Sequence, residues 1–256
     1  MSQRYVISGC FYLDSCVVLS EILGQNASRM RKFKEDVEKY SITCYVSKSV
    51  IKECKDKLAK TTDFLGNVLK DVIKVSLEGI ISPRKLDTAI VSNNDFHIIK
   101  ETFLTVNQTA RNFDLVTDPF QVIEEWIVEK MEKEMEKPKN KRVTLDKFVK
   151  RITAVILEET TRLVSNFERL VELEADYIVK SNQTEDPQVL QILVNNGIEQ
   201  SDATHISVVA SHQKNVGGKA IFLTFDYKTI LRRWKQIKRL TQVVCCDPIY
   251  GLSHLR

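Results

Sequence analysis

The sequence has no apolar run long enough to cross a membrane, since a spanning helix needs about 20 such residues. Its first residues also lack the order of a secretory signal, in which a basic stretch precedes an apolar one. We therefore expect a soluble, cytoplasmic protein without a membrane partner.

The cysteines form no pattern of zinc or disulfide sites. None of the six belongs to a CxxC pair, and none has companion histidines at zinc spacing. Several lie in apolar runs, where free cysteine behaves as a small hydrophobe, so we expect reduced thiols in a reducing compartment. The six are Cys10, Cys16, Cys44, Cys54, Cys245 and Cys246.

Signatures of three common phosphate-binding sites are also absent. The segment VGGKA at 216–220 lacks the GxxxxGK[ST] form of a phosphate loop, and GxGxxG occurs nowhere in the chain. A dehalogenase-type phosphatase needs a second aspartate two positions after Asp14, where this sequence has Cys16. These three classes are excluded.

The overall charge does not identify a partner. Hydrophobic residues make up 43% of the chain and charged residues 28%, which is ordinary for a globular protein. Lys and Arg number 38 against 34 Asp and Glu, so the net charge is +4. This mildly basic balance permits a nucleic-acid partner, and the local arrangement of charge must decide.

The chain divides into three zones that differ in the pattern of their apolar residues. Residues 1–60 and 175–256 alternate short apolar runs with helical periodicity, the rhythm of a parallel sheet with crossover helices. Residues 61–174 are almost purely helical in pattern. We therefore predict an α/β protein in which a large all-helical insertion separates the two halves of one core.

These patterns predict individual elements. In the first zone we predict strands at 10–13 and 42–46 and helices around 17–23 and 30–40. In the last zone, Asp186 before Pro187 predicts a helix start, and Gly197 predicts the end of that helix. The other predictions are strands at 176–179, 220–225 and 242–246, and helices from 201 or 202 to 213 and from 227 to 239.

The run from Glu129 to Arg142 is highly charged and is broken at Pro138. One interpretation is the solvated tip of a helical hairpin. The other is an arm that contacts substrate, or that mediates binding of a protein partner or self-association through the insertion.

Two aspartates directly follow predicted buried strands. Asp14 ends the strand GCFYL, and Asp226 ends the apolar run 220–225. Open α/β sheets bind ligands at the carboxyl ends of their strands, although an aspartate there is often only an N-cap. Thr224 precedes Asp226 by two positions and therefore points to the same side of the strand.

Two further acids lie on predicted helices. Ile206 and Val209 follow Asp202 by one and two turns, so its carboxylate lies on the buried stripe of the helix. An ionised group there is costly unless a cation or strong donors meet it, and the alternative is an N-cap. Glu53 flanks an apolar helix face, where a lone glutamate is usually solvated. His205, one turn beyond Asp202, could approach the same place, but a locally satisfied histidine is more common.

Together these residues resemble a family signature. YLDS at 12–15, VIKEC at 50–54, SDATHISVVA at 201–210 and FLTFD at 222–226 are similar to the motifs of PIN-domain nucleases. The resemblance covers the first and last zones, about half of the chain. It implies that four acids are catalytic and bind metal, with two accompanying hydroxyls. The acids are Asp14, Glu53, Asp202 and Asp226, and the hydroxyls are those of Ser15 and Thr224.

The resemblance also implies a three-layer α/β/α fold with a central parallel sheet, and one or two Mg²⁺ or Mn²⁺ ions among the acids. Converging carboxylates repel one another and raise some pKa values, and hard divalent cations relieve that repulsion. We expect Asp14, Asp202 and Asp226 to be ligands, while Glu53 ligates a second ion or positions the attacking water.

Two features depart from the family pattern. The insertion leaves 202 − 53 = 149 positions between the second and third acids, where the family has a short helical stretch. Long insertions between fixed elements cost little in closure entropy, so the pocket remains feasible. Phe225 occupies the middle of the T-x-D ending, where many relatives carry a basic residue.

The function that the resemblance implies is hydrolysis of phosphodiester bonds, with an endoribonuclease as the leading hypothesis. The alternatives are a structure-specific DNA nuclease, whose insertion clamps a strand, and a catalytically silent RNA-binding or scaffold module. A basic stripe at helical spacing is a candidate for phosphate contacts, or else a solvated surface. It comprises Lys228, Arg232, Lys235 and Arg239, while Tyr227 and Trp234 fall on the apolar face of the same predicted helix.

Overall fold

The structure is a computed structural model, which describes residues 9–60, 143–172 and 177–255 and scattered positions between 63 and 136. Contacts divide the chain into two compact units: residues 1–56 with 165–256, and residues 57–164. Much of the predicted insertion at 61–174, including part of the charged run 129–142, lies outside the described residues. Among the residues that are described, no helix is long and apolar enough to span a bilayer.

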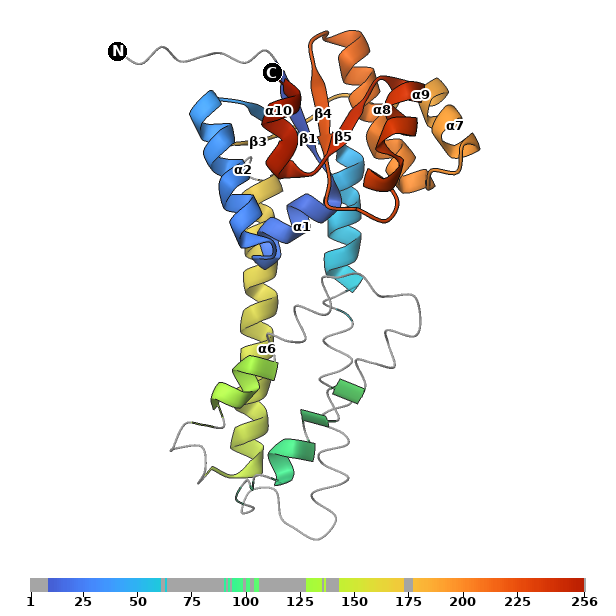
Figure 1. Ribbon diagram of the computed structural model, residues 1–256. Helices are drawn as coiled ribbons and strands as arrows, with labels where there is room; N and C mark the ends of the chain where they lie inside the picture. Colours follow the sequence, from blue (N-terminus) through green and yellow to red (C-terminus); the bar gives the residue numbers. More distant parts are fainter. Residues whose placement is uncertain are drawn as a thin grey trace, which may run out of the picture. The chain divides into compact units, whose positions relative to one another are not determined.

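A five-stranded sheet forms the centre of the first unit, and all its strands are parallel (Figure 1). The strand order is β3-β2-β1-β4-β5, so β1 is central and pairs with β2 on one side and β4 on the other. The predicted α/β class and parallel sheet are therefore confirmed. The strands are β1 (Cys10–Leu13), β2 (Thr43–Val46), β3 (Ile178–Lys180), β4 (Ala220–Leu223) and β5 (Val244–Cys246).

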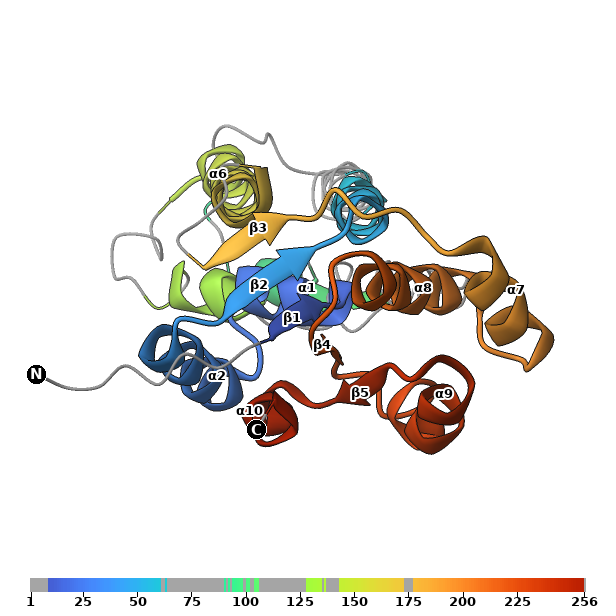
Figure 2. The same cartoon turned by 90° about the horizontal axis from the view of Figure 1, so that it is seen from above.

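Helices lie on both sides of this sheet. Figure 2 shows α8 on one side and α2 and α10 on the other. The helices of the first half are α1 (Ser15–Leu23), α2 (Ala27–Tyr40) and one at 48–60. Those of the second half are α7 (Pro187–Asn195), α8 (Gln200–Asn215), α9 (Trp234–Thr241) and α10 (Gly251–Leu255), with 3₁₀ turns η3 (Leu231–Arg233) and η4 (Pro248–Tyr250). Before β3, α6 (Leu145–Phe167) ends in a π-helical turn, η2 (Glu168–Glu172).

Alternating side chains of the central strands pack against these helices. Tyr12 of β1 and Phe222 of β4 belong to one buried cluster with Ile206 of α8. Phe11, the neighbour of Tyr12, packs with its ring centroid 5.9 Å from that of Phe33 in α2. Because both faces of the sheet are covered, the central strands are apolar throughout.

The start of α7 confirms its predicted signal. The Asp186 side chain accepts the N–H groups of Gln188 and Val189 at 3.0 and 3.2 Å, and Pro187 is the first helical residue. The helix α8 begins earlier than predicted, with Glu199 as N-cap, so Asp202 lies inside its first turn. The N-cap alternative for Asp202 is therefore wrong.

The predicted helix at 227–239 is wrong in its first half. Residues 227–230 form a turn that leads into η3, and α9 begins only at Trp234. The cause is local, because one carboxylate oxygen of Asp226 accepts the N–H groups of Lys228 and Thr229, each at 2.9 Å. An aspartate that bonds the backbone two and three residues ahead turns the chain at that point.

Candidate active site

Asp14 lies at the carboxyl end of β1 and is almost fully buried. Its carboxylate accepts hydrogen bonds from the N–H of Ser15 and the hydroxyl of Thr224, both at 2.7 Å, and from the thiol of Cys16 at 3.1 Å. Asp14 is also the N-cap of α1, so the structural role and the site role fall on one residue. This many donors to a buried carboxyl favour its ionised form.

Glu53 is linked to Asp14 through two other residues, Ser15 and His205. The hydroxyl of Ser15 donates to Glu53 Oε1 at 2.8 Å. The imidazole of His205 lies between the two acids, with Nδ1 3.4 Å from Asp14 Oδ1 and Nε2 3.3 Å from Glu53 Oε2. These are ion-pair separations, and among the described residues Nδ1 has no well-formed hydrogen bond.

Asp202 and Asp226 form a second linked pair. The hydroxyl of Thr229 lies 3.3 Å from Asp202 Oδ2 and also contacts Asp226 Oδ2. Asp226 is joined to the first pair by Thr224, whose hydroxyl accepts the Asp226 N–H at 2.9 Å. The structure thus brings all four sequence-predicted acids to one region at the carboxyl end of the sheet.

The pKa values of these groups diverge. Burial alone raises the pKa of Asp14, but the bonds and charge of His205, with Thr224 and Cys16, lower it overall. Burial lowers the pKa of His205, but Asp14 and Glu53 together raise it above 6.5. Burial, followed by the charges of Asp14 and Asp226, raises the pKa of Asp202 to about 7. The surroundings therefore favour the charged form of His205 and the neutral form of Asp202, each relative to the free side chain.

The four carboxyl groups are not arranged around one common centre. Among the residues that the structure describes, no three His, Cys, Asp or Glu side chains are arranged to hold a metal ion. They stand instead as two pairs, one bridged by His205 and the other by Thr229.

Sequence reasoning underrated His205 and missed Thr229 and Cys16. A signal existed for His205, because it follows Asp202 by three positions and so lies on the same helical face. Thr229 was not predicted as a site residue, because the turn that brings it to Asp202 and Asp226 was predicted as part of a helix. Cys16 of α1 donates to Asp14 and also contacts Thr224 and the Phe225 N–H just after β4. Only the pairing of β1 with β4 reveals the last two contacts.

The basic side chains do not form one helical stripe, so that prediction is wrong in its geometry. Lys228 lies in the turn and Arg232 in η3, while Lys235 and Arg239 lie in α9. All four are exposed and follow Asp226 along one short stretch of chain. Trp234 packs against the buried cluster, as predicted.

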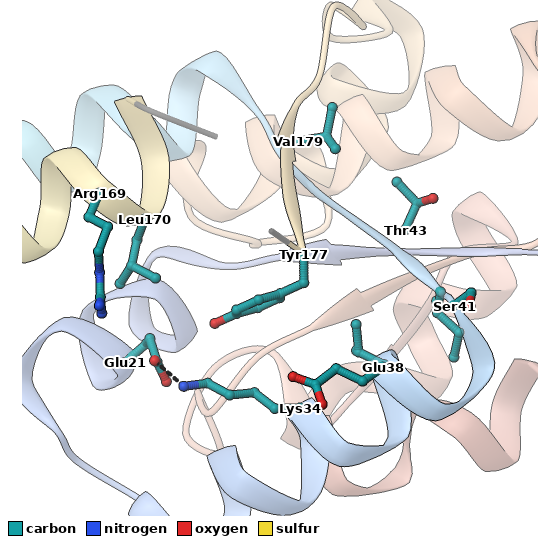
Figure 3. A pocket seen from close by; sticks show the side chains of 11 residues that line it. Glu21, Lys34, Glu38, Ser41, Thr43, Arg169, Leu170, Tyr177 and Val179 are labelled. Atoms are coloured by element: carbon teal, nitrogen blue, oxygen red, sulfur yellow. Dashed lines mark hydrogen bonds and ion pairs between the residues drawn. The ribbon is translucent and has the colours of Figure 1, made fainter. Parts of the chain in front are cut away.

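Two cavities in the first unit differ in their relation to the acids. A cavity of about 320 Å³ opens beside Asp202 and Thr229, with Arg233 on its rim. A larger one of about 710 Å³ contains none of the four acids, and Figure 3 shows Tyr177 within it pointing toward Glu21. We take the smaller cavity as the candidate site, because it is lined by Asp202, a carboxyl with a strongly raised pKa.

Comparison with protein-family models, with curated proteins and with solved structures found no match.

Proposed function

We propose that this chain is a metal-dependent nuclease of the PIN type, which hydrolyses phosphodiester bonds with Mg²⁺ or Mn²⁺. The observation that carries the proposal is the gathering of four carboxyl groups at the carboxyl end of the sheet, in two linked pairs that Thr224 joins. Burial, with the nearby charges of Asp14 and Asp226, raises the pKa of Asp202, as expected where carboxylates converge. A divalent cation among oxygen ligands is the ordinary way to offset such charge.

The donor set fits this ion. Asp14, Asp202 and Asp226 offer carboxylate oxygens, which suit Mg²⁺ or Mn²⁺ better than zinc. Glu53 would ligate a second ion or position the attacking water. When bound, the metal supplies Lewis-acid stabilisation of the charge that develops at the scissile phosphate.

The remaining side chains hold these acids in place. The hydroxyls of Ser15 and Thr224 each fix one carboxylate by a short hydrogen bond. His205 keeps Asp14 and Glu53 together by its position between them. Positioning of this kind matters because a reacting group displaced by about 1 Å can lose roughly a hundredfold in rate.

We favour RNA as the substrate over DNA, with the exposed Lys228 and Arg232 contacting phosphates. A catalytically silent module is the less favoured alternative, because all four acids are present and lie together. Self-association or protein binding through the insertion remains a prediction.

The test is cleavage of matched RNA and DNA strands by the full chain in Mg²⁺, in Mn²⁺ and in EDTA. We expect metal-dependent cleavage that Asp226→Asn lowers by about 10²-fold or more, a typical loss when a group that stabilises the transition state is removed. The exposed Glu185→Gln is the control and should cleave like the wild type. Equal cleavage in EDTA, or full activity of Asp226→Asn, would overturn the proposal.

A further inference from the structure

An exposed tyrosine comes directly after one acid of the cluster in the chain. Tyr227 follows Asp226 in the chain and is 52% exposed. Sequence patterning placed it on a buried helical face, so this exposure is a correction. Large aromatic rings are informative when they are exposed, because burying them is strongly favourable.

The ring is exposed but held firmly. Its hydroxyl donates to Asp247, a buried carboxyl that follows β5, and accepts from Arg29 Nη1 at 2.9 Å. Arg29 also pairs with Asp247 at 3.1 Å, and its guanidinium carbon lies 5.9 Å from the centroid of the Tyr227 ring. Arg29 therefore packs against the ring, while half of the residue stays open to solvent.

A second exposed tyrosine follows Asp247 by three residues, and its backbone N–H donates to the Asp247 carbonyl at 2.9 Å. Tyr250 is 57% exposed and ends η4, the turn that Asp247 caps through the Ile249 N–H at 3.0 Å. Among the described residues, Tyr227 and Tyr250 are the large aromatic side chains with the greatest exposure. Both are anchored around Asp247, and β5 is the parallel neighbour of β4, which leads to Asp226.

We propose that Tyr227, Tyr250 and Arg29 form a tyrosine patch that stacks unpaired bases of single-stranded nucleic acid beside the acids. This inference rests on the proposed nuclease function and names its substrate class. In a duplex the faces of the bases are stacked and hidden, whereas a single strand can place a base on an aromatic ring. Because Tyr227 adjoins Asp226, a nucleotide stacked on it lies next to the one at the acids.

The arrangement favours stacking over a purely ionic contact. The charge of Arg29 is offset by Asp247, so it serves mainly to fix the ring. Lys228, the next residue after Tyr227, is exposed and can contact the adjoining phosphate. A rigid aromatic ring next to a free cation is the usual composition of a single-strand site. A protein partner on this patch is the alternative that the experiment separates.

The test measures binding by fluorescence anisotropy of labelled oligonucleotides in EDTA, so that cleavage plays no part. Each strand is prepared as RNA and as DNA, in single-stranded, duplex and abasic forms. Four variants are compared with wild type. Tyr227→Leu and Tyr250→Leu each remove one aromatic face, Tyr227→Phe keeps the ring without its hydroxyl, and Val216→Ala is an exposed control outside the patch.

We expect Tyr227→Leu to weaken single-strand binding roughly 5- to 150-fold, the range for loss of one stacked base. Tyr227→Phe should lose much less and Val216→Ala nothing, and Tyr250→Leu should weaken binding in the same direction as Tyr227→Leu. Abasic strands should bind weakly and should not distinguish Tyr227→Leu from wild type. Because Tyr227→Phe also loses the bond to Asp247, it shows whether disturbed folding explains the effect.

The two proposals fail in different ways. If the wild type binds single strands and Tyr227→Leu binds them equally well, the tyrosine patch is overturned and the nuclease proposal survives. Equal binding of abasic and base-bearing strands overturns the patch in the same way. If no nucleic acid binds, the nuclease proposal itself fails, and the patch as a nucleic-acid site fails with it.

Discussion

The hydroxyl of Thr224 donates a 2.7 Å hydrogen bond to Asp14 Oδ2, although the two residues are 210 positions apart in the chain. The same hydroxyl accepts the backbone N–H of Asp226 at 2.9 Å. Thr224 is fully buried, so both bonds are shielded from water. One side chain thus connects the acid that ends β1 to the acid that follows β4.

Thr224→Val should therefore disturb stability and metal binding together. Valine nearly keeps the shape of threonine but removes the hydroxyl bond to Asp14 Oδ2, which then keeps only the weaker thiol donor of Cys16. It also removes the hydroxyl oxygen that accepts the Asp226 N–H. We expect unfolding free energy to fall by about 1.5–3 kcal/mol, the usual value of a bond to a charged group. Chemical denaturation and Mn²⁺ calorimetry measure both effects. Thr224→Ser retains the hydroxyl and should lose much less; equal losses in the two variants would contradict this role.

Asp202→Asn should stabilise the metal-free protein, and increasingly so as pH rises. The folded pKa of Asp202, about 7, exceeds its ordinary 3.8, so the folded state holds the proton more tightly. Wild-type stability is greatest below about pH 4 on this account and falls until about pH 7. The variant lacks that loss, so at pH 8 it should exceed the wild type by on the order of a few kcal/mol.

Urea unfolding at pH 4 and pH 8 in EDTA checks this dependence. Glu185→Gln, an exposed acid outside the cluster, should not change the pH dependence. Adding Mn²⁺ should reverse the order at pH 8, because only the wild type retains the ligand. A stability difference that is the same at both pH values would show that Asp202 does not titrate as described.

Asp14→Asn should have the opposite effect and destabilise the metal-free protein. His205, Thr224 and Cys16 lower the pKa of Asp14 despite its burial, so its ionised form is stabilised. This contribution is present above the ordinary pKa of 3.8 and is lost as pH falls through the lower folded value. We expect a loss of about 1–3 kcal/mol at pH 7, which shrinks in acid, together with weaker Mn²⁺ binding. A variant as stable as the wild type at pH 7 would contradict this account.

The sequence could predict where the acids lie, but it could not predict the opposite effects of replacing Asp14 and Asp202. Strands β1 and β4 and the aspartates that follow them were predictable, because an apolar run ending in an acid is a local pattern. The capping of α7 by Asp186 was equally local and was confirmed. Whether the fold stabilises or destabilises the ionised form of an acid depends on which hydrogen-bond donors reach it from distant segments. No local pattern carries that information.

One prediction failed because two local signals in the sequence favoured different structures after Asp226. Apolar and basic residues at helical spacing predicted a helix from Tyr227, but the carboxylate of Asp226 bonds the next N–H groups and turns the chain first. The helix consequently starts at Trp234, and Tyr227 faces solvent. The helical periodicity predicted the second half of this segment correctly, but it did not predict the turn that Asp226 forms at its start.

Reversal of Lys228 and Arg232 to glutamate should weaken nucleic-acid binding without loss of metal binding. Both side chains are exposed, and Lys228 interacts with Asp226 only through its backbone N–H. Each phosphate contact that is lost should reduce the slope of log affinity against log salt by about 0.7 to 0.9. Lys39→Glu, an exposed reversal at the end of α2, is the control. An unchanged salt slope would exclude phosphate contacts at these two residues.

Removal of residues 57–164, with a short linker from Asp56 to Ser165, should leave a folded core. This boundary differs from the sequence division at 61 and 174, because Asn166 Nδ2 donates to the Ile22 carbonyl at 3.4 Å and Phe167 and Leu170 are buried. The contacts assign all three to the unit that contains the sheet. We expect cooperative urea unfolding and retained Mn²⁺ binding, since the four acids lie in that unit. A shortened protein that unfolds gradually, while the full chain unfolds cooperatively, would show that the insertion belongs to the main core.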